Sequence, residues 1–295
     1  MIGIRNNSMS AKNAEVWVNE LRLVGYESKG GMAAHSTLAL RLSDVASIDL
    51  SGQMSTAGFG GLEQSIQDRK TDDHYKYSIT TSTNVGRFLP KNSHISIPVY
   101  YSYTREQTSP KYSPYDTDLL LDDVIESYPE GHARDSIKSI SQDIRESHNF
   151  SISNAKVNIS SDKPMPYDPA NFSFSYSESV SDRSNSTIEY EHDLNWKASI
   201  DYSYSPALKG WTPFEGIGYD AKWFSIVKDT KISFLPQSFS FNTGLQRSYH
   251  ELQERDLEGT EGIPVTFSQQ FYWNRDLSIR WDPLQLIKLS FNANL

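Results

Sequence analysis

The sequence predicts an all-β protein, an antiparallel up-and-down section of a transmembrane β-barrel wall. The residues from Thr187 to Tyr204 show this best. Every odd position there is polar, and the even positions are apolar or aromatic apart from one histidine. Alternation with a period of two indicates a strand with one apolar and one wet face. Ordinary strands have about 5–6 residues, whereas this stretch would rise about 45 Å at a tilt of about 40°, enough to cross a membrane.

The two faces of this stretch give the candidate functional residues. We expect the odd positions to line a water-filled lumen: Glu189, Glu191, Asp193, Asn195, Lys197 and Asp201. We expect the even positions to face lipid or to form the aromatic girdles at the membrane surfaces: Tyr190, Leu194, Trp196, Ile200, Tyr202 and Tyr204. His192, on the even face, is expected at a girdle, where a half-polar ring is tolerated.

The composition agrees with a wall that is wet on one side. Hydrophobic residues make up 37% of the 295 residues and aromatic residues 12%, so apolar content is low for a packed core while aromatic side chains are plentiful. The net charge is −9 and no basic stripe is present, which argues against nucleic-acid binding. There is no cysteine, so disulfides and thiolate metal sites are excluded. No run approaches the length of a transmembrane helix.

The first half of the chain predicts two hairpins. A strand is expected at Ala14–Leu23, and residues 34–42 and 46–50 alternate around a short connection. After a loop at 56–73, residues 75–85 and 95–103 form the next pair. Pro98 cannot donate to a ladder, so a bulge or unpaired position is expected there.

A long excursion is expected at 106–147, with an amphipathic helix around 136–145. Excursions of this length in compact domains are usually functional, and barrels place them on one rim. We therefore expect this segment and the loop at 56–73 to meet cargo or partner proteins.

The second half continues the alternation. A strand with a register break at Asn154 precedes the hairpin of residues 172–176 and 187–204, and a turn is expected at Asp282-Pro283. Further expected elements are a short helix or strand at 221–229 and alternating stretches at 232–234, 239–245, 265–281 and 287–295. The pattern predicts about a dozen strands in one partial barrel segment spanning 1–295. Because the first residues lack a signal-type apolar region and the last are still alternating, we expect a piece of something longer.

For each candidate catalytic or ligand-binding site, the residue pattern favours a solvated polar surface instead. Glu189, Glu191 and Asp193 could be glycosidase carboxylates, but every odd position nearby is polar too. The glycines of 57–65 lack the Lys-Ser/Thr ending of a phosphate loop. Four aspartates could hold calcium, Asp116, Asp118, Asp122 and Asp123, but they lack calcium-loop spacing. No histidine pair has zinc-site spacing. We expect no catalytic, cofactor or metal site, and no enzyme activity.

Six motifs in order carry a resemblance to a known family. They are GIRN, AEVWVNELRL (Ala14–Leu23), STAGFGGLEQS, the IP-x-YYSYT of Ile97–Thr104, YSPYDTD and YWNRDLSIRWDP (Tyr272–Pro283). Together they resemble the SprA/Sov outer-membrane translocon of the type IX secretion system, and the second and last are the most specific.

The resemblance implies a bacterial outer-membrane location and a very large single-chain barrel, of which this chain is an internal section. It implies passage of folded cargo proteins, linked to gliding motility. It also implies membrane lipid, secreted cargo, a smaller outer-membrane barrel and a plug-type protein as partners. Two alternatives stay open: a generic porin or receptor-type barrel, and a soluble β-rich carbohydrate-binding module or enzyme.

Overall fold

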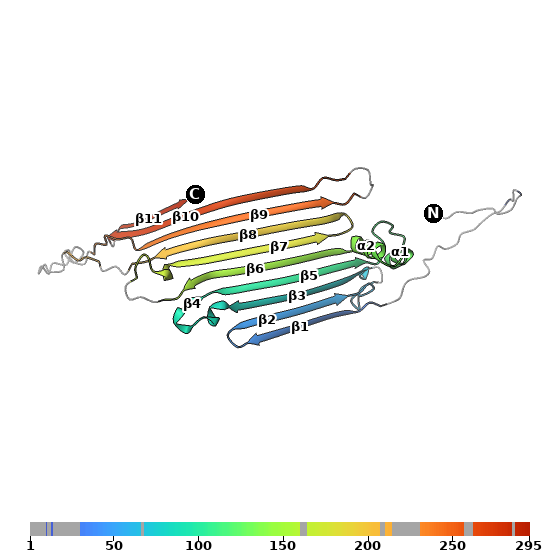
Figure 1. Cartoon of the computed structure of the whole chain (residues 1–295), viewed down its shortest axis with the longest axis horizontal. Coiled ribbons are helices and arrows are strands. Elements are labelled where there is room, and N and C mark those ends of the chain that lie inside the picture. The colour runs from blue at the N-terminus through green and yellow to red at the C-terminus, as the bar shows by residue number, and fades with distance from the viewer. Residues whose placement is uncertain are drawn as a thin grey trace.

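The computed structural model describes residues 10, 13, 30–65, 68–159, 164–206, 210–213, 231–256, 262–284 and 287–295. Within these ranges the chain forms one 11-stranded sheet with two short helices at one end (Figure 1). The strand expected at Ala14–Leu23 and the element expected at 221–229 lie outside the described residues.

The elements follow the alternating stretches of the sequence. The strands are β1 (Ala33–Leu42), β2 (Ala46–Ser55), β3 (Asp72–Asn84), β4 (Ile95–Ser96), β5 (Pro98–Pro110), β6 (Asp143–Val157), β7 (Phe172–Ser184), β8 (Ile188–Tyr204), β9 (Ser238–Glu254), β10 (Thr266–Leu284) and β11 (Ile287–Asn294). The helices are α1 (Leu121–Ser127) and α2 (His132–Ser141), with 3-10 turns η2 (Val85–Phe88), η3 (Lys91–Ser93) and η4 (Pro169–Asn171).

The strands are joined as a simple meander. The order in the sheet is β1-β2-β3-β5-β6-β7-β8-β9-β10-β11, and the short β4 pairs with β6 off this path. All these pairs are antiparallel. The predicted all-β, antiparallel up-and-down architecture is therefore confirmed. In the described residues β1 and β11 are the two open edges, so the sheet is not closed into a barrel.

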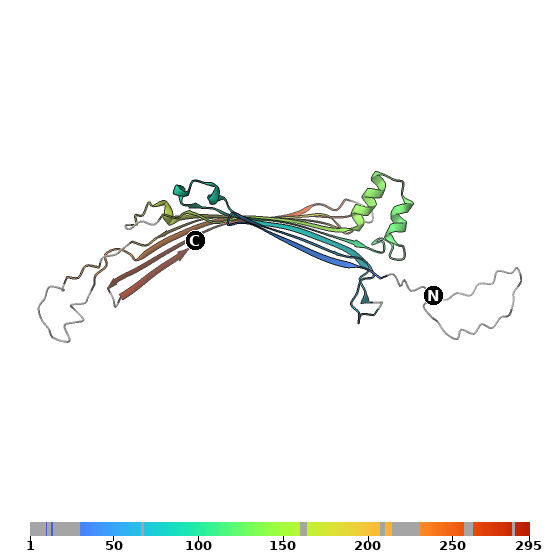
Figure 2. The same ribbon diagram turned by 90° about the horizontal axis from the view of Figure 1, so that it is seen from below.

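The sheet is a single layer without a hydrophobic core. Seen edge-on, it is a twisted ribbon with α1 and α2 standing at one end (Figure 2). Among the described apolar residues only Leu121, which is 4% exposed, is buried. Leu38 and Phe291, near opposite edges, are 52% and 56% exposed. Soluble domains bury such faces between two layers, whereas here one layer leaves both faces open.

The register carries the two faces of β8 across the whole sheet, because directly paired residues of an antiparallel ladder lie on one face. The line of partners through Trp196 shows the apolar side. It runs Leu40, Ile48, Thr81, Tyr101, Phe150, Glu178, Trp196, Arg247 and Phe271. The apolar faces of separate strands therefore form one continuous surface, broken by a few charged side chains.

Two predicted irregularities are confirmed. The pairing of β6 with β7 shifts between Ile152 and Ala155, and Asn154 takes a positive φ of 52°. This extra residue keeps Ala155 on the same face as Ile152 although their spacing is odd. Pro98 is unpaired on one side only: it pairs with Asn84 of β3, but it has no partner on β6, whose pairing passes from Val99 to Ser96.

Three sequence-based boundaries differ from the structure. The excursion expected at 106–147 occupies only 111–142, because residues 105–108 pair with residues 143–146. The helix expected around 136–145 is α2, which ends at Ser141. Asp282-Pro283 does not turn the chain: it forms a bulge, and β10 continues until Leu284 pairs with Ile287. A bulge accepts proline because it leaves one residue outside the ladder.

Candidate functional site: a two-faced wall and its loop rim

β8 is a middle strand of the sheet and holds all twelve predicted site residues. Its pairing with β7 is regular from Glu191 to Tyr202, so the odd and even positions there point to opposite faces. The ladder with β9 shifts between Ile188 and Tyr190, which places Glu189 at an irregularity. The separation into two faces is thus fixed by geometry. The assignment of one face to a lumen and the other to lipid stays a prediction.

The polar face is covered by side chains that hydrogen-bond across strands. The hydroxyl oxygens of Ser51 and Ser78 are 2.7 Å apart. Asn149 donates to Ser102 over 3.2 Å. Asn242 of β9 donates to Asp201 of β8, one of the predicted lumen residues. These pairs satisfy polar groups locally, and water can reach the remainder.

On the apolar face, aromatic rings gather at the strand ends remote from α1 and α2. The ring of Tyr202 lies between those of Phe172, at 4.9 Å, and Phe239, at 5.7 Å. The hydroxyls of Tyr202 and Tyr204 donate to the carbonyl oxygens of Pro166 and Pro164, at 2.8 and 3.3 Å. Rings with an apolar body and a hydrogen-bonded tip are typical of membrane-interface girdles.

The structure adds charged groups to the apolar face that the pattern of β8 alone did not reveal. An ion pair joins Arg105 of β5 to Glu146 of β6 at 3.0 Å. Nδ1 of His192 lies 2.6 Å from Oδ1 of Asp182 on β7. Each of these ionisable groups contacts a neighbour on the same face.

A trio on the polar face could hold a metal ion. Potential ligand atoms, one from each residue, lie within 4.8 Å of one another in Glu191, Asp193 and His250. The Asp193 carboxylate is 2.7 Å from His250 Nδ1. Sequence spacing could not reveal this trio, because β8 and β9 supply its members from 57 positions apart. Arg183 of β7 lies directly opposite Glu191 in the register. Its positive charge would compete with a metal ion for the Glu191 carboxylate. Polar surfaces commonly gather such groups without an ion.

The acidic segment considered for calcium has other contacts. The Asp116 carboxylate accepts a hydrogen bond from the backbone N–H of Asp118 at 3.3 Å. Asp122 and Asp123 occupy the first turn of α1, where carboxylates complement the helix dipole. The carboxylates of Asp116, Asp122 and Asp123 therefore act locally on a turn and a helix end.

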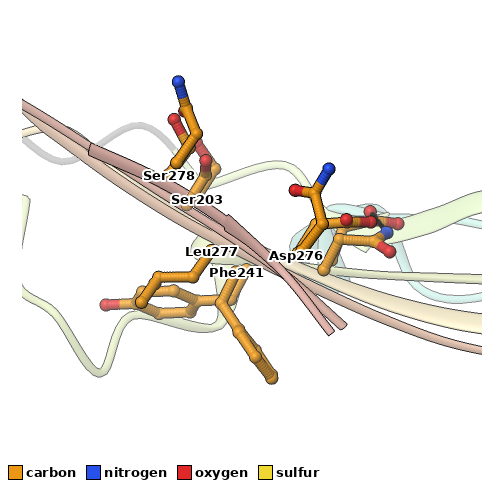
Figure 3. Close-up of a pocket in the computed structure, with 11 residues that line it drawn as sticks. Ser203, Phe241, Asp276, Leu277 and Ser278 are labelled. Atoms are coloured by element: carbon orange, nitrogen blue, oxygen red, sulfur yellow. Dashed lines mark hydrogen bonds between the residues drawn. The ribbon is translucent and has the colours of Figure 1, made fainter. Parts of the chain in front are cut away.

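A hollow lined by the adjacent strands β8, β9, β10 and β11 displays the two faces together (Figure 3). Ser203, Asp276 and Ser278 point to one side of the ribbon, and Phe241 and Leu277 point to the other. Hydroxyl and carboxylate groups thus alternate with apolar groups along the same strands. Such a surface presents a polar side and an apolar side rather than an enclosed substrate pocket.

The two loops expected to contact cargo or partners meet at one rim. The backbone N–H of Lys111, which opens the excursion, donates to the carbonyl of Thr71 in the β2–β3 loop at 3.0 Å. A second hollow there is lined from both segments, by Gly58 and Lys70 of the loop and by Leu121 of α1, among others. None of the helices in the described part of the chain is long and apolar enough to cross a membrane.

Comparison with known proteins supports the resemblance drawn from the motifs. Residues 1–125 match the family SprA_N, described as "Motility related/secretion protein". The matched range includes β1 to β5 and the first residues of α1. A search of curated proteins finds no match.

Proposed function

We propose, on the premise that this chain is a SprA-like motility- and secretion-related protein, that it forms part of the wall of a protein-conducting channel in the bacterial outer membrane. The apolar face meets acyl chains, and the polar face lines an aqueous lumen through which folded cargo of type IX secretion passes. The role is passage rather than catalysis. Lipid, cargo, a smaller barrel and a plug-type protein are the proposed partners.

The uncovered apolar face carries this proposal. Ile200, at the middle of the sheet, is 49% exposed and lies between Phe174 and Thr243 on the neighbouring strands. Apolar surface left in water forgoes about 25 cal/mol per Å², and soluble monomers rarely expose an apolar patch above a few hundred Å². Here the patch crosses ten paired strands. Acyl chains can cover a face of this extent without a second protein layer.

The polar face supports the lumen part of the proposal. On β7, every second residue from Ser173 to Ser181 is a serine that belongs to this face. β8 continues the face with acids, amides and Lys197. Short hydroxyl groups and mixed charges bind water well and offer little apolar area to a passing protein. Wide barrels of the outer membrane enclose water-filled lumens of this character.

The two rival functions differ in how much the structure favours them. A soluble carbohydrate-binding module or enzyme needs strands around an internal core, and among the described residues only Leu121 is buried and apolar. A generic porin or receptor barrel shares the sheet and its faces, so cargo contact must separate it from a protein-conducting channel.

Single cysteines can test both faces, because these 295 residues contain no cysteine and any cysteine elsewhere in the complete protein can be replaced by serine. Ser199→Cys and Ile200→Cys are adjacent on β8 and point to opposite faces. In the complete protein in cells, a photo-crosslinker attached to the cysteine at position 199 should capture secreted cargo, and the same reagent at position 200 should not. A small water-soluble maleimide should also label position 199 much faster than position 200.

Correct assembly of both variants in the outer membrane is the control. Equal maleimide labelling of the two positions would rule out the lipid-facing assignment. Slow labelling at position 200 without cargo capture at position 199 would instead favour the generic barrel.

A further inference from the structure

Charged and histidine side chains on the apolar face stop at a line that crosses the strands obliquely. Beyond it, toward the strand ends remote from α1 and α2, the described part of this face carries none. The last such residues on five strands define this oblique line: Arg105 (β5), His148 (β6), Glu178 (β7), Arg247 (β9) and Arg275 (β10). On β8 the line passes through Trp196, which pairs with Glu178 and Arg247, while His192 lies on the charged side.

The slope of the oblique line follows from the register. The partners of Arg105 are, in order, Glu146, Asp182, His192, Glu251 and Phe267. Arg275 lies eight residues farther along β10 than Phe267. At about 3.3 Å per residue and about 4.8 Å per strand step, the line rises about 26 Å over about 24 Å. It is therefore inclined by about 45° to a line perpendicular to the strands.

The far edge of the apolar band has the same slope. The partners of Val99, at the start of β5, are Ile152, Tyr176, Ala198, Leu245 and Trp273. Trp281, the last residue of β10 paired with β11 before the bulge, lies eight residues beyond Trp273. On both β5 and β10 the band is six residue steps wide, as a slab would produce when strands cross it at an angle.

Aromatic side chains accompany the oblique line. Tyr103 contacts His148 with ring centroids 4.7 Å apart. The hydroxyl of Tyr176 donates to Glu178 at 2.5 Å. The Arg275 guanidinium stacks over Trp273 at 4.4 Å. Tyrosine and tryptophan mixed with charged groups is the composition found where barrels meet lipid headgroups.

We propose that the oblique line lies at the headgroup level of one leaflet and that the strands cross the bilayer at about 45°. This rests on the proposed membrane function and adds which residues meet headgroups and which meet acyl chains. Spanning barrels tilt their strands by about 35–45°, so the line has the slope that a bilayer surface requires. Strand ends on the side of α1 and α2 then project beyond the acyl chains, progressively farther from β5 to β10, where this part of the face carries the exposed Phe267 and Phe271.

The thickness of the band is compatible with this assignment. It spans six residue steps on β5, from Arg105 to Val99, and nine on β6, from His148 to Val157, of which the bulge at Asn154 takes up one. These are about 20–26 Å along a strand, or about 14–19 Å of height at this tilt. Long arginine and glutamate side chains extend outward by several Å more, which approaches the apolar band of about 25 Å in known barrels.

Depth measurements at three positions test the proposal. Val99 and Trp273 lie in one row of partners that runs perpendicular to the strands. Val99 and Trp281, in contrast, lie on the same edge of the oblique band. Each is replaced by the only cysteine of the full-length protein and labelled with the fluorophore NBD. The protein is placed in phosphatidylcholine vesicles with doxyl quenchers near the headgroup or near the chain end.

We expect matching quenching depths at positions 99 and 281, and a clearly shallower, red-shifted signal at position 273. Matching depths at 99 and 273, with 281 different, would overturn the oblique assignment while leaving the membrane function intact. Absence of quenching at all three positions would overturn both. If any of these variants fails to assemble, Tyr101, Phe271 and Ile279 form an equivalent set with the same two relations.

Discussion

The two faces of the sheet share one backbone ladder but satisfy their polar groups differently. On the polar face, exposed pairs such as Arg41 and Asp49, 3.0 Å apart, and hydroxyl pairs such as Ser51 and Ser78 are spread over the surface. On the apolar face, charged groups stay on one side of the oblique line. The contrast shows that charge is confined to one part of the apolar face and is spread over the polar face.

Loss of one residue within β8 should have the largest effect on this contrast. Deleting Asn195 reverses the facing of Trp196 and every later residue of the strand, because a one-residue slip exchanges the two faces. We expect loss of outer-membrane assembly, measured by heat-modifiable migration and protease resistance of the complete protein.

Deletion of Asn154 is the matched control. It removes the extra residue of the bulge and leaves Ala155 and Val157 on the apolar face, at the loss of one hydrogen bond to Ser175. We expect assembly close to normal. Equal damage from the two deletions would contradict the importance of facing.

A charge placed on each face should have the next largest effect. Ile200→Arg puts a cation among Phe174 and Thr243, where lipid-facing arginine costs about 2–4 kcal/mol. Ser199→Arg places the same side chain on the polar face at little cost. Denaturant unfolding of the assembled protein in detergent or lipid measures the difference. Ile200 is a sharper probe than Trp196, which is flanked by Glu178 and Arg247.

Removal of one charge from an ion pair should lower stability by different amounts on the two faces, and the difference should be smaller than for an added arginine. Glu146→Gln leaves Arg105 without its partner beside the apolar band, for which we expect a cost of about 1–2 kcal/mol. Asp49→Asn breaks the exposed pair with Arg41, and such pairs contribute about 0–1 kcal/mol. The same unfolding assay compares them, with added salt reducing the effect of Asp49→Asn first. A larger cost at Asp49 would reverse the proposed ranking of the faces.

The smallest effect is expected from the hydroxyl pair of the polar face. Ser51→Ala removes one partner of Ser78, and the net contribution of such a hydrogen bond is about 0.5–1.5 kcal/mol at most. Because water can replace the lost partner, we expect about 0.5 kcal/mol or less. A double-mutant cycle with Ser78→Ala measures the coupling directly, and a coupling well above about 1 kcal/mol would indicate that water is excluded from this face.

Local chemistry explains which details the sequence could predict. The alternation of β8 and the break at Asn154 were readable because each depends on neighbouring residues. Asp282-Pro283 was wrongly expected to be a turn, because proline and aspartate fit a bulge as well as a turn. The excursion at 106–147 was too wide for a related reason: residues 105–108 and 143–146 are polar apart from Ile144 and show no clear alternation, but they pair with one another.

The sequence by itself determined that the strands are long and two-faced, because a period of two is a property of each strand alone, and short connections between successive strands predicted antiparallel pairing. Only the tertiary structure decided how the strands align, since interstrand hydrogen bonds join residues far apart in the chain. That alignment makes one continuous apolar surface and brings Glu191 and Asp193 beside His250. It also arranges Arg105, Glu178 and Arg275 along a slanted boundary that no single strand could display.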